Sequence, residues 1–389
     1  MEETLFAERR QCLLLFMRQK EDAPEPSEDA SYMRECLTLG RKGTGFVSPN
    51  PLVGAVLVHD GRVVARGYHR IFGGPHAEVE CLRRFKHDAS SSTLYVNLEP
   101  CSHYGKTPPC VDLIVQRGIR RVVVGMQDPN PLVSGRSIRK LRRAGIEVRV
   151  GVLRKEAEEL NRTFIKHITT GLPYVHVKIA QTADGFIASR KRMRGYITSS
   201  HALKQVHCWR AEYDAVLVGA RTLTIDNPQL NVRFTHGRDP AVVVVDGRLF
   251  VSGKERVFRS ARARRIFVCT TNDALQQHKA KAALLVSLGV SVLPFQGEQN
   301  RIDPRALLKK LYRLGIASVL VEGGREIFSQ FIERRLLDEL TIFFSPKRFG
   351  RGLPAMSDRA QQSLMRWLKG KQCFGQTVGN DYMLTARKQ

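Results

Sequence analysis

The stretch Pro75-His76-Ala77-Glu78, together with Glu99-Pro100-Cys101 and the later Cys110, decides the fold of the first half of this chain. His76 lies where a loop enters an expected helix, and Cys101 follows an expected strand, with eight residues between it and Cys110. Zinc favours sulfur and nitrogen ligands, and a catalytic zinc site offers three protein ligands and keeps its fourth position for water. His76, Cys101 and Cys110 supply that ligand set, so the sequence predicts one catalytic Zn²⁺ per chain.

Glu78 follows the histidine by two residues and is predicted to be catalytic. A carboxylate beside an activated water can take its proton and hand it to a ring nitrogen and then to leaving ammonia. This pattern is the zinc-deaminase signature, in which the glutamate is not a ligand. Either half of the pattern alone is a weak signal, but both in order are strong. The alternatives are unconnected core cysteines or a closed structural zinc site, which would usually provide four protein ligands.

Composition predicts a cytoplasmic globular protein without a membrane span. The chain has 389 residues, 42% of them hydrophobic, and its apolar runs are too short to cross a bilayer. A formal net charge of +26 suggests anionic partners such as phosphorylated metabolites, a dinucleotide or nucleic acid. The basic residues are spread along the chain in short groups, which favours a basic solvated surface over a nucleic-acid stripe.

Hydrophobic patterns divide the chain into three parts. Residues 1–28 read as an extension and linker, 29–171 as one α/β domain, and 172–389 as a second, with the break at Gly171-Leu172-Pro173. In the first domain, strands at 52–58, 93–98, 121–125 and 146–150 alternate with helices at 77–85, 110–117, 136–144 and 156–167. Asp60-Gly61 is a hairpin signal. The second domain is expected to contain strands at 174–180, 215–218, 241–246, 266–270, 290–294, 318–322 and 339–344. Such alternation is typical of a sheet covered by helices.

These motifs resemble the bifunctional riboflavin-biosynthesis deaminase–reductase family of the RibD type. The matching stretches are Ser48-Pro49-Asn50-Pro51-Leu52-Val53-Gly54, Pro75 to Val79, Glu99 to Cys110 and Met126 to Pro131. The resemblance implies a cytidine-deaminase-like three-layer domain followed by a dihydrofolate-reductase-like α/β domain. It further implies zinc-dependent deamination of a diaminopyrimidinone carrying a phosphoribosylamino group, and then NADPH-dependent reduction of the opened ribose to ribitol. The expected partner is therefore a small phosphorylated pyrimidine, and we expect a homo-oligomer.

In the deaminase domain, the resemblance assigns substrate contacts to Asn50 and Lys106. On the residues alone, Asn50 is equally well a turn residue between two prolines, and Lys106 is equally well a solvated loop lysine.

In the reductase domain, the resemblance assigns cofactor contacts to Ala180, Tyr196, Thr222, Asp226, Gly247 and Gly324. It assigns substrate contacts to Arg194, Arg210, Leu230, Arg233 and Glu322. Arginines clamp phosphates through charge-assisted hydrogen bonds, although any single arginine in so basic a chain is more often a surface residue. Gly323-Gly324 ends a strand and opens a helix, where backbone amides can approach a phosphate, but such a pair is often only a turn.

Three positions depart from the family pattern. Tyr196 replaces a tryptophan, Arg194 stands where a small hydroxyl residue meets the substrate, and Gly247 replaces a serine. These departures leave open a deaminase with a silent or altered reductase. The charge leaves open an RNA-acting deaminase, although the eight-residue cysteine spacing and the second domain disfavour it.

Overall fold

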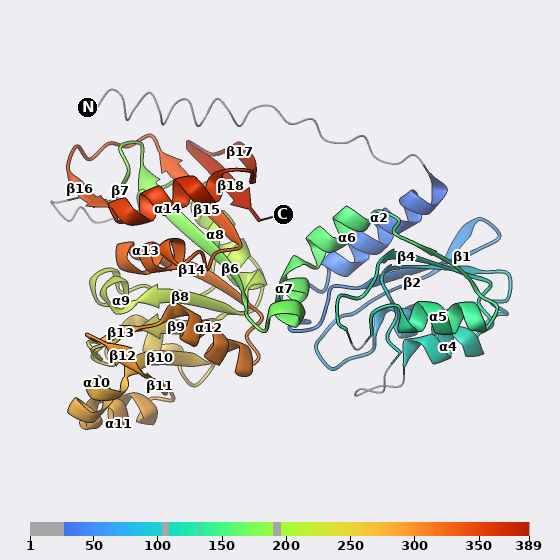
Figure 1. Cartoon of the computed structure of the whole chain (residues 1–389), viewed down its shortest axis with the longest axis horizontal. Helices are drawn as coiled ribbons and strands as arrows, with labels where there is room; N and C mark the ends of the chain where they lie inside the picture. The colour runs from blue at the N-terminus through green and yellow to red at the C-terminus, as the bar shows by residue number, and fades with distance from the viewer. Residues whose placement is uncertain (1–26, 103–108, 132, 190–195, 389) are drawn as a thin grey trace. The chain divides into compact units, whose positions relative to one another are not determined.

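The computed structural model describes residues 27–102, 109–131, 133–189 and 196–388 (Figure 1). They form two compact units, and the change from one to the other falls between Leu172 and Pro173. Lys106 and Arg194, both predicted to contact substrate, lie outside the described residues. Within the described ranges, no helix combines the length and the apolar character that crossing a membrane requires.

The first unit is built on a five-stranded sheet of order β2-β1-β3-β4-β5. The strands are β1 (Gly54–His59), β2 (Arg62–Tyr68), β3 (Thr93–Leu98), β4 (Arg121–Met126) and β5 (Glu147–Val150). The expected hairpin turn joins β1 and β2, because Asp60 and Gly61 both adopt positive φ angles, of 48° and 70°. β1 also pairs antiparallel with β3, whereas β3, β4 and β5 are parallel. This sheet carries Cys101 just beyond the end of β3.

Helices cover both faces of this sheet. α2 (Glu28–Arg41) packs against α6 (Arg154–Leu160), whereas α3 (Ala77–Leu82), α4 (Cys110–Gln116) and α5 (Arg136–Arg143) form the other layer (Figure 1). The core between the layers is apolar, with Val56, Leu94 and Val123 fully buried. Ser27 caps α2 by accepting a hydrogen bond from the Ala30 backbone. The expected three-layer fold is confirmed.

The predicted single helix over 156–167 is wrong, because the structure contains two helices. α6 ends at Leu160, and α7 (Arg162–Thr170) begins after Asn161. The Asn161 side chain is buried: its Oδ1 accepts from the Leu52 backbone N at 2.8 Å, and its Nδ2 donates to the Leu52 O at 3.1 Å. Asparagine competes for backbone groups in this way and interrupts helices. The two hydrogen bonds of Asn161 therefore connect the junction of α6 and α7 to the segment that leads into β1.

The second unit contains a nine-stranded sheet of order β11-β10-β9-β8-β14-β6-β15-β18-β17. Its parallel part consists of β6 (Tyr174–Thr182), β8 (Ala215–Gly219), β9 (Ala241–Val245), β10 (Ile266–Thr271), β11 (Ser291–Phe295), β14 (Ser318–Gly323) and β15 (Glu339–Ser345). These are the seven strands that the sequence predicted, with ends that differ by a residue or two. Their runs of valine and other β-branched residues suit strands that are buried on both faces.

Six further strands were not expected. They are β7 (Phe186–Ser189), β12 (Gly297–Glu298), β13 (Arg301–Ile302), β16 (Gly352–Pro354), β17 (Gln372–Val378) and β18 (Asp381–Arg387). Most are short, and β17 is largely exposed at the sheet edge, so its sequence lacks an apolar alternation. β17 and β18 add an antiparallel edge to β15.

The helices of the second unit follow or precede these strands. They are α8 (Ser200–Glu212), α9 (Ala220–Asp226), α10 (Asn272–Gln277), α11 (Lys279–Ser287), α12 (Pro304–Arg313), α13 (Arg325–Glu333) and α14 (Asp358–Leu368). Because β6, β8, β9, β10 and β14 are parallel, their carboxyl ends lie along one edge of the sheet. In open α/β sheets, ligands bind at that edge.

Candidate active sites

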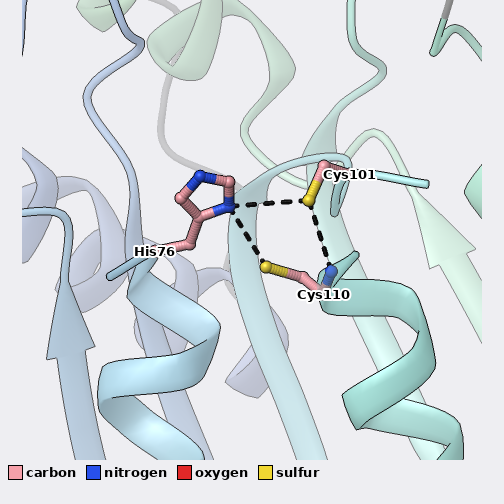
Figure 2. Close-up of side chains that lie close together, drawn as sticks. All are labelled: His76, Cys101 and Cys110. Carbon is pink, nitrogen blue, oxygen red and sulfur yellow. Dashed lines mark hydrogen bonds between the residues drawn. The ribbon is translucent and has the colours of Figure 1, made fainter. Parts of the chain in front are cut away.

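The three predicted zinc ligands converge at one point in the first unit (Figure 2). His76 is the residue immediately before α3, Cys101 follows β3, and Cys110 is the first residue of α4. The His76 Nδ1 atom lies 3.2 Å from the Cys110 Sγ and 3.5 Å from the Cys101 Sγ. All three candidate ligand atoms lie within 4.8 Å of one another. Two helix starts and one strand end thus deliver the ligand set.

This geometry and donor chemistry fit zinc. With Zn–S bonds of about 2.3 Å and Zn–N bonds of about 2.0 Å, a tetrahedral site places its nitrogen roughly 3.5 Å from each sulfur. The two observed nitrogen–sulfur distances are 3.2 and 3.5 Å. Among the described residues, these three are the only group of His, Cys, Asp or Glu side chains placed to hold a metal. Three protein ligands leave a fourth position free, as a catalytic site requires.

The electrostatics of the cluster favour a thiolate. The hydrogen bond from Cys110 is the main cause that lowers the pKa of Cys101 to about 4, and His76 adds to it. The same pairing, with burial, raises the pKa of Cys110. The Cys101 Sγ also accepts a hydrogen bond from the Cys110 backbone N at 3.3 Å. Thiolates are the form of cysteine that binds a divalent cation, so metal binding at this pair would release protons.

Glu78 lies in the first turn of α3 with only 3% of its surface exposed. Burial, and secondly the charge of Cys101, raises the pKa of its carboxyl group. Its side chain hydrogen-bonds with Cys110, which places the carboxylate directly beside the ligand set. A carboxylate so placed can exchange protons with a molecule bound at the open position.

Glu99 is a buried carboxylate to which the sequence motif alone assigned no role. It is the residue after β3, two before Cys101, and it is 3% exposed. Its oxygens accept hydrogen bonds from the Gly135 backbone N at 2.9 Å and from the Ser137 Oγ at 2.6 Å. The segment that carries Cys101 is therefore fixed to the start of α5. Its position two residues before a ligand cysteine is the signal that could have identified it.

His69, a residue that was not predicted from the sequence, connects Asn50 to the predicted zinc ligand His76. The His69 Nδ1 lies 2.9 Å from the Pro75 carbonyl, and the His69 Nε2 lies 3.1 Å from the Asn50 Nδ2. A carbonyl only accepts, so Nδ1 carries the proton and Nε2 accepts from the Asn50 amide. The His69 ring also meets the His76 ring edge-on, with centroids 5.6 Å apart. No motif in the sequence identifies His69, because its contact with Asn50, 19 residues away, is formed only by the fold.

In the second unit, Arg210 and Glu322 form a buried ion pair. The Arg210 Nε donates to the Glu322 Oε1 at 2.6 Å, and its Nη2 donates to Oε2 at 2.8 Å. The Nζ of Lys178, a residue with no role predicted from the sequence, lies 3.7 Å from the Glu322 Oε2. Burial alone would raise the pKa of Glu322, but Arg210 and Lys178 lower it to about 2. Burial lowers the pKa of Lys178.

The predicted cofactor residues Thr222 and Gly324 meet at the ends of neighbouring strands. A Cβ atom added at Gly324 would lie 2.9 Å from the Thr222 Oγ1, and one added at Gly323 would lie 3.2 Å from it. Gly324 precedes α13, whose N-terminus has no side-chain cap. Ala180 lies near the end of β6, next to β14 in the sheet. These residues leave bare backbone at a helix N-terminus, which suits a phosphate.

The predicted substrate residues Leu230 and Arg233 surround Asn231. The Arg210 Nη1 donates to the Asn231 O at 3.2 Å, and the Arg233 Nη1 donates to the Asn231 Oδ1 at 3.0 Å. The Arg233 Nη2 also donates to the hydroxyl of Tyr196 at 3.0 Å. Leu230 itself is buried. The structure thus brings Arg210, Arg233 and Tyr196 together.

The two remaining predicted cofactor residues lie further along the same edge. Asp226 is the last residue of α9, and Gly247 follows β9. A Cβ atom added at Gly247 would lie 1.8 Å from the Asn300 carbonyl oxygen. This contact explains why glycine replaces serine here, since the turn between β12 and β13 packs onto the Gly247 backbone.

Comparison with known proteins identifies both units. Residues 26–126 match the cytidine and deoxycytidylate deaminase zinc-binding region, and residues 173–384 match the RibD C-terminal domain. The riboflavin biosynthesis protein RibD of Actinobacillus pleuropneumoniae is 38% identical over 363 residues, which cover 92% of this chain and 95% of that protein. The Escherichia coli RibD protein is 35% identical, with 83% and 89% covered.

Solved structures agree. A deaminase/reductase from Thermotoga maritima is 38% identical with a TM-score of 0.80, covering 93% of this chain and 99% of that one. RibD of Acinetobacter baumannii is 33% identical with a TM-score of 0.82, and the match covers 93% of this chain and 99% of that one. The family resemblance seen in the sequence is confirmed: this chain belongs to the RibD family of riboflavin-biosynthesis proteins, joining a zinc-binding deaminase domain to a reductase domain of the NADPH-binding type.

Proposed function

We propose that this chain catalyses both reactions for which the Thermotoga maritima protein is named, on the same substrates. The first is deamination of diaminohydroxyphosphoribosylaminopyrimidine, and the second is reduction of 5-amino-6-(5-phosphoribosylamino)uracil. The observation that carries the proposal is the convergence of His76, Cys101 and Cys110 beside a buried glutamate. We further propose that the enzyme is a cytoplasmic homo-oligomer without a nucleic-acid partner.

In the deaminase step, His76, Cys101 and Cys110 would hold the zinc. When bound, zinc supplies Lewis-acid activation of water for attack on the pyrimidine carbon that carries the amine. Glu78 accepts a proton at its carboxylate and delivers it first to the ring nitrogen and then to the departing amine. Its burial beside the ligands excludes bulk water from this transfer.

Asn50 is proposed to orient the pyrimidine. Because its Nδ2 faces His69, its Oδ1 is available to accept a hydrogen bond from the substrate. Lys106 is proposed to neutralise the substrate phosphate. The Asn50 contact would hold the pyrimidine ring near the ligand set, because Asn50 is bonded to His69, which is bonded to the residue before His76.

In the reductase step, bound NADPH would supply the hydride that reduces the open-chain carbon of the ribosyl group. Ala180, Tyr196, Thr222, Asp226, Gly247 and Gly324 are proposed to hold the cofactor. Arg194, Arg210, Leu230, Arg233 and Glu322 are proposed to hold the substrate. Lys178 presents a positive charge beside Glu322, where a proton can be held for the oxygen or nitrogen that gains electron density.

A coupled assay tests the proposal. Purified full-length protein is incubated with the diaminopyrimidinone phosphoribosyl substrate and NADPH, with and without a zinc chelator. We expect ammonia release and NADPH oxidation, and a loss of both on chelation, because the second step consumes the product of the first. Supplying the deaminated product directly should restore NADPH oxidation in chelated enzyme. Absence of both signals from untreated protein would refute the proposal.

A second candidate function is a deaminase with a silent reductase. Two substitutions at proposed cofactor positions favour it: Tyr196 stands where the family has tryptophan, and Gly247 stands where it has serine. The same assay separates the two candidates, since this one predicts ammonia release without NADPH oxidation.

A further inference from the structure

The loop that carries the proposed substrate residues Leu230 and Arg233 has an unfavourable backbone conformation. Leu230 has a φ angle of 52°, in the left-handed region that residues other than glycine seldom occupy. Its side chain is only 2% exposed, so this conformation lies inside the protein and not in a free turn. Backbone strain of this kind persists only where the surrounding structure stabilises it, and it is concentrated at functional sites. The groups that hold Leu230 are therefore of interest.

Arg264 holds this loop by its carbonyl groups. It lies between a short 3₁₀ helix (Arg256–Ser260) and β10, 34 residues after Leu230 in the sequence. Its Nη1 donates a hydrogen bond to the Leu230 O at 2.7 Å, and its Nη2 donates to the Gln229 O. Its Nε donates to the Ser260 Oγ at 2.9 Å, which orients the guanidinium group. One side chain thus holds the carbonyl of the strained residue and the carbonyl before it.

The Arg264 guanidinium also connects the loop to the sheet. Its Nη1 reaches the Pro240 O at 3.4 Å, and Pro240 is the residue before β9. β9 pairs with β10, which begins two residues after Arg264. A guanidinium presents its N–H donors in a fixed plane, so it can hold several carbonyl groups in one arrangement, whereas an ammonium group cannot. Arg264 therefore fixes the loop relative to two strands of the central sheet.

Three further side chains hold the rest of the loop backbone. Each bonds one backbone group: Arg210 bonds the Asn231 O at 3.2 Å, Asp239 the Val232 N at 2.7 Å, and His207 the Arg233 N at 3.1 Å. The backbone from 229 to 233 is thus fixed at every residue, whereas the Arg233 side chain is exposed. A fixed backbone under an exposed guanidinium determines where that guanidinium is presented, which is the arrangement of a preorganised anion contact.

We propose that Arg264 is a positioning residue of the reductase, which holds Leu230 in its left-handed conformation and so presents Arg233 to the phosphorylated substrate. Substrate binding then does not have to order the loop, and the affinity that ordering would remove is retained. The inference rests on the proposed reductase function and adds a residue to which neither the motifs nor the family resemblance gives a role. Because Arg264 acts on binding, its loss should raise KM for the deaminated substrate and change kcat little.

Steady-state kinetics of the full chain test the inference with two variants and a neighbouring control. In Arg264→Gln we expect KM for the deaminated substrate to rise about 10- to 100-fold, with kcat and KM for NADPH changed less than about threefold. Arg264→Lys keeps the charge without the planar set of donors, so its KM should rise about three- to tenfold. Arg265→Gln removes the next guanidinium, which donates to the Leu314 O at 3.0 Å, and should match the wild type.

A double-mutant cycle with Arg233 distinguishes positioning from a merely structural role. In an Arg233→Gln background the guanidinium that the loop presents is gone, so Arg264→Gln should raise KM at least about threefold less than it does in the wild type. The same rise in both backgrounds would overturn the inference, as would a wild-type KM in Arg264→Gln. If Arg264→Gln does not fold, Arg264→Lys takes its place in the cycle, and a wild-type KM in that variant would overturn the inference.

A binding measurement separates this inference from the reductase proposal. Calorimetry on the full chain measures the affinity for 5-amino-6-(5-phosphoribosylamino)uracil without turnover. We expect weaker binding to Arg264→Gln than to the wild type and to Arg265→Gln, by the same factor as the rise in KM. That difference in a protein that oxidises no NADPH would refute the reductase and uphold the role of Arg264. Equal affinity in the three proteins, when the wild type does oxidise NADPH, would refute the role of Arg264 alone.

Discussion

The deaminase and reductase sites bring charged side chains together by different means. The zinc ligands come from a short part of the chain and lie where two helices begin and a strand ends, so a metal can organise them locally (Figure 2). The reductase cluster joins Lys178 on β6, Arg210 on α8 and Glu322 on β14, and no metal is needed to hold it. A metal site requires particular residue types at particular spacings in the sequence, whereas an ion pair requires only side chains of opposite charge. The first kind of site can therefore be predicted from residue types and spacing alone, whereas Arg210 and Glu322 were assigned only through the family resemblance, and Lys178 was not assigned at all.

The largest effect on activity is expected from two variants that distinguish the zinc ligands from the proton carrier Glu78. Glu78→Gln should keep zinc and lower deamination by about 10²- to 10⁴-fold, because it removes a proton carrier and not a ligand. Cys110→Ser should lose zinc and deamination together. The measurements are zinc content by elemental analysis and ammonia release with the diaminopyrimidinone substrate.

The control for both variants is NADPH oxidation with the deaminated product supplied directly. It should match the wild type, since neither residue belongs to the reductase unit. Loss of zinc from Glu78→Gln would show that the glutamate is a ligand and that the role assigned to it is wrong.

The next largest effect is expected from a change in the buried cluster of Lys178, Arg210 and Glu322. Glu322→Gln would leave Arg210 and Lys178 buried without their counter-charge, and removing one partner of a buried pair typically costs about 3–5 kcal/mol. We expect a lower unfolding midpoint for the reductase unit and loss of NADPH oxidation. Ammonia release should persist. Urea unfolding followed by Trp209 and Trp367 fluorescence checks stability, since both tryptophans lie in that unit. An unchanged midpoint would contradict the ion-pair argument.

This contrast also explains how much the sequence could reveal. The zinc ligands, Glu78, the hairpin at Asp60-Gly61 and the seven parallel strands of the reductase unit were predictable, because each depends on local residue type or periodicity. Lys178 was not found, because one lysine among 63 lysines and arginines carries no signal until the sheet places β6 beside β14.

Contacts between distant segments account for the other omissions. The helix break at Asn161 depends on the hydrogen bonds of its side chain to Leu52. The need for glycine at 247 arises because the Asn300 carbonyl oxygen occupies the space that a Cβ atom would take. The Asn50 orientation depends on His69, which the Pro75 carbonyl fixes in one tautomer. None of these partners is adjacent in sequence, so periodicity and motif spacing could not reveal them.

A smaller effect is expected from an ion pair remote from the ligands. The Asp29 carboxylate, 7% exposed, accepts hydrogen bonds from Arg121 at 2.8 and 2.9 Å and from Arg149 at 2.7 Å. The bond from Arg121 is the main cause that lowers its pKa from 3.8 to about 2. The carboxylate therefore stabilises the folded deaminase unit above about pH 4, and this contribution is lost as the pH falls towards 2.

Asp29→Asn tests that linkage. It should destabilise the deaminase unit by about 2 kcal/mol at pH 7, and the difference from wild type should shrink below pH 4. Unfolding midpoints measured at several pH values check this, while zinc content at pH 7 should stay unchanged. A difference between the two proteins that grows with falling pH would contradict the sign of the effect.

The smallest effect is expected from Tyr196, where the reductase departs from its family. Its hydroxyl accepts a hydrogen bond from Arg233, and 60% of its surface is exposed, so the bond competes with water. Tyr196→Phe should therefore raise KM for the deaminated substrate about two- to threefold and leave kcat nearly unchanged. Tyr196→Trp supplies the family's residue without this bond, so it should show the same rise in KM if the hydroxyl matters and none if only ring area matters. A large fall in kcat for Tyr196→Phe would instead place the hydroxyl among the reacting groups, and the reductase would then depend on one exposed side chain as sharply as the deaminase depends on Glu78.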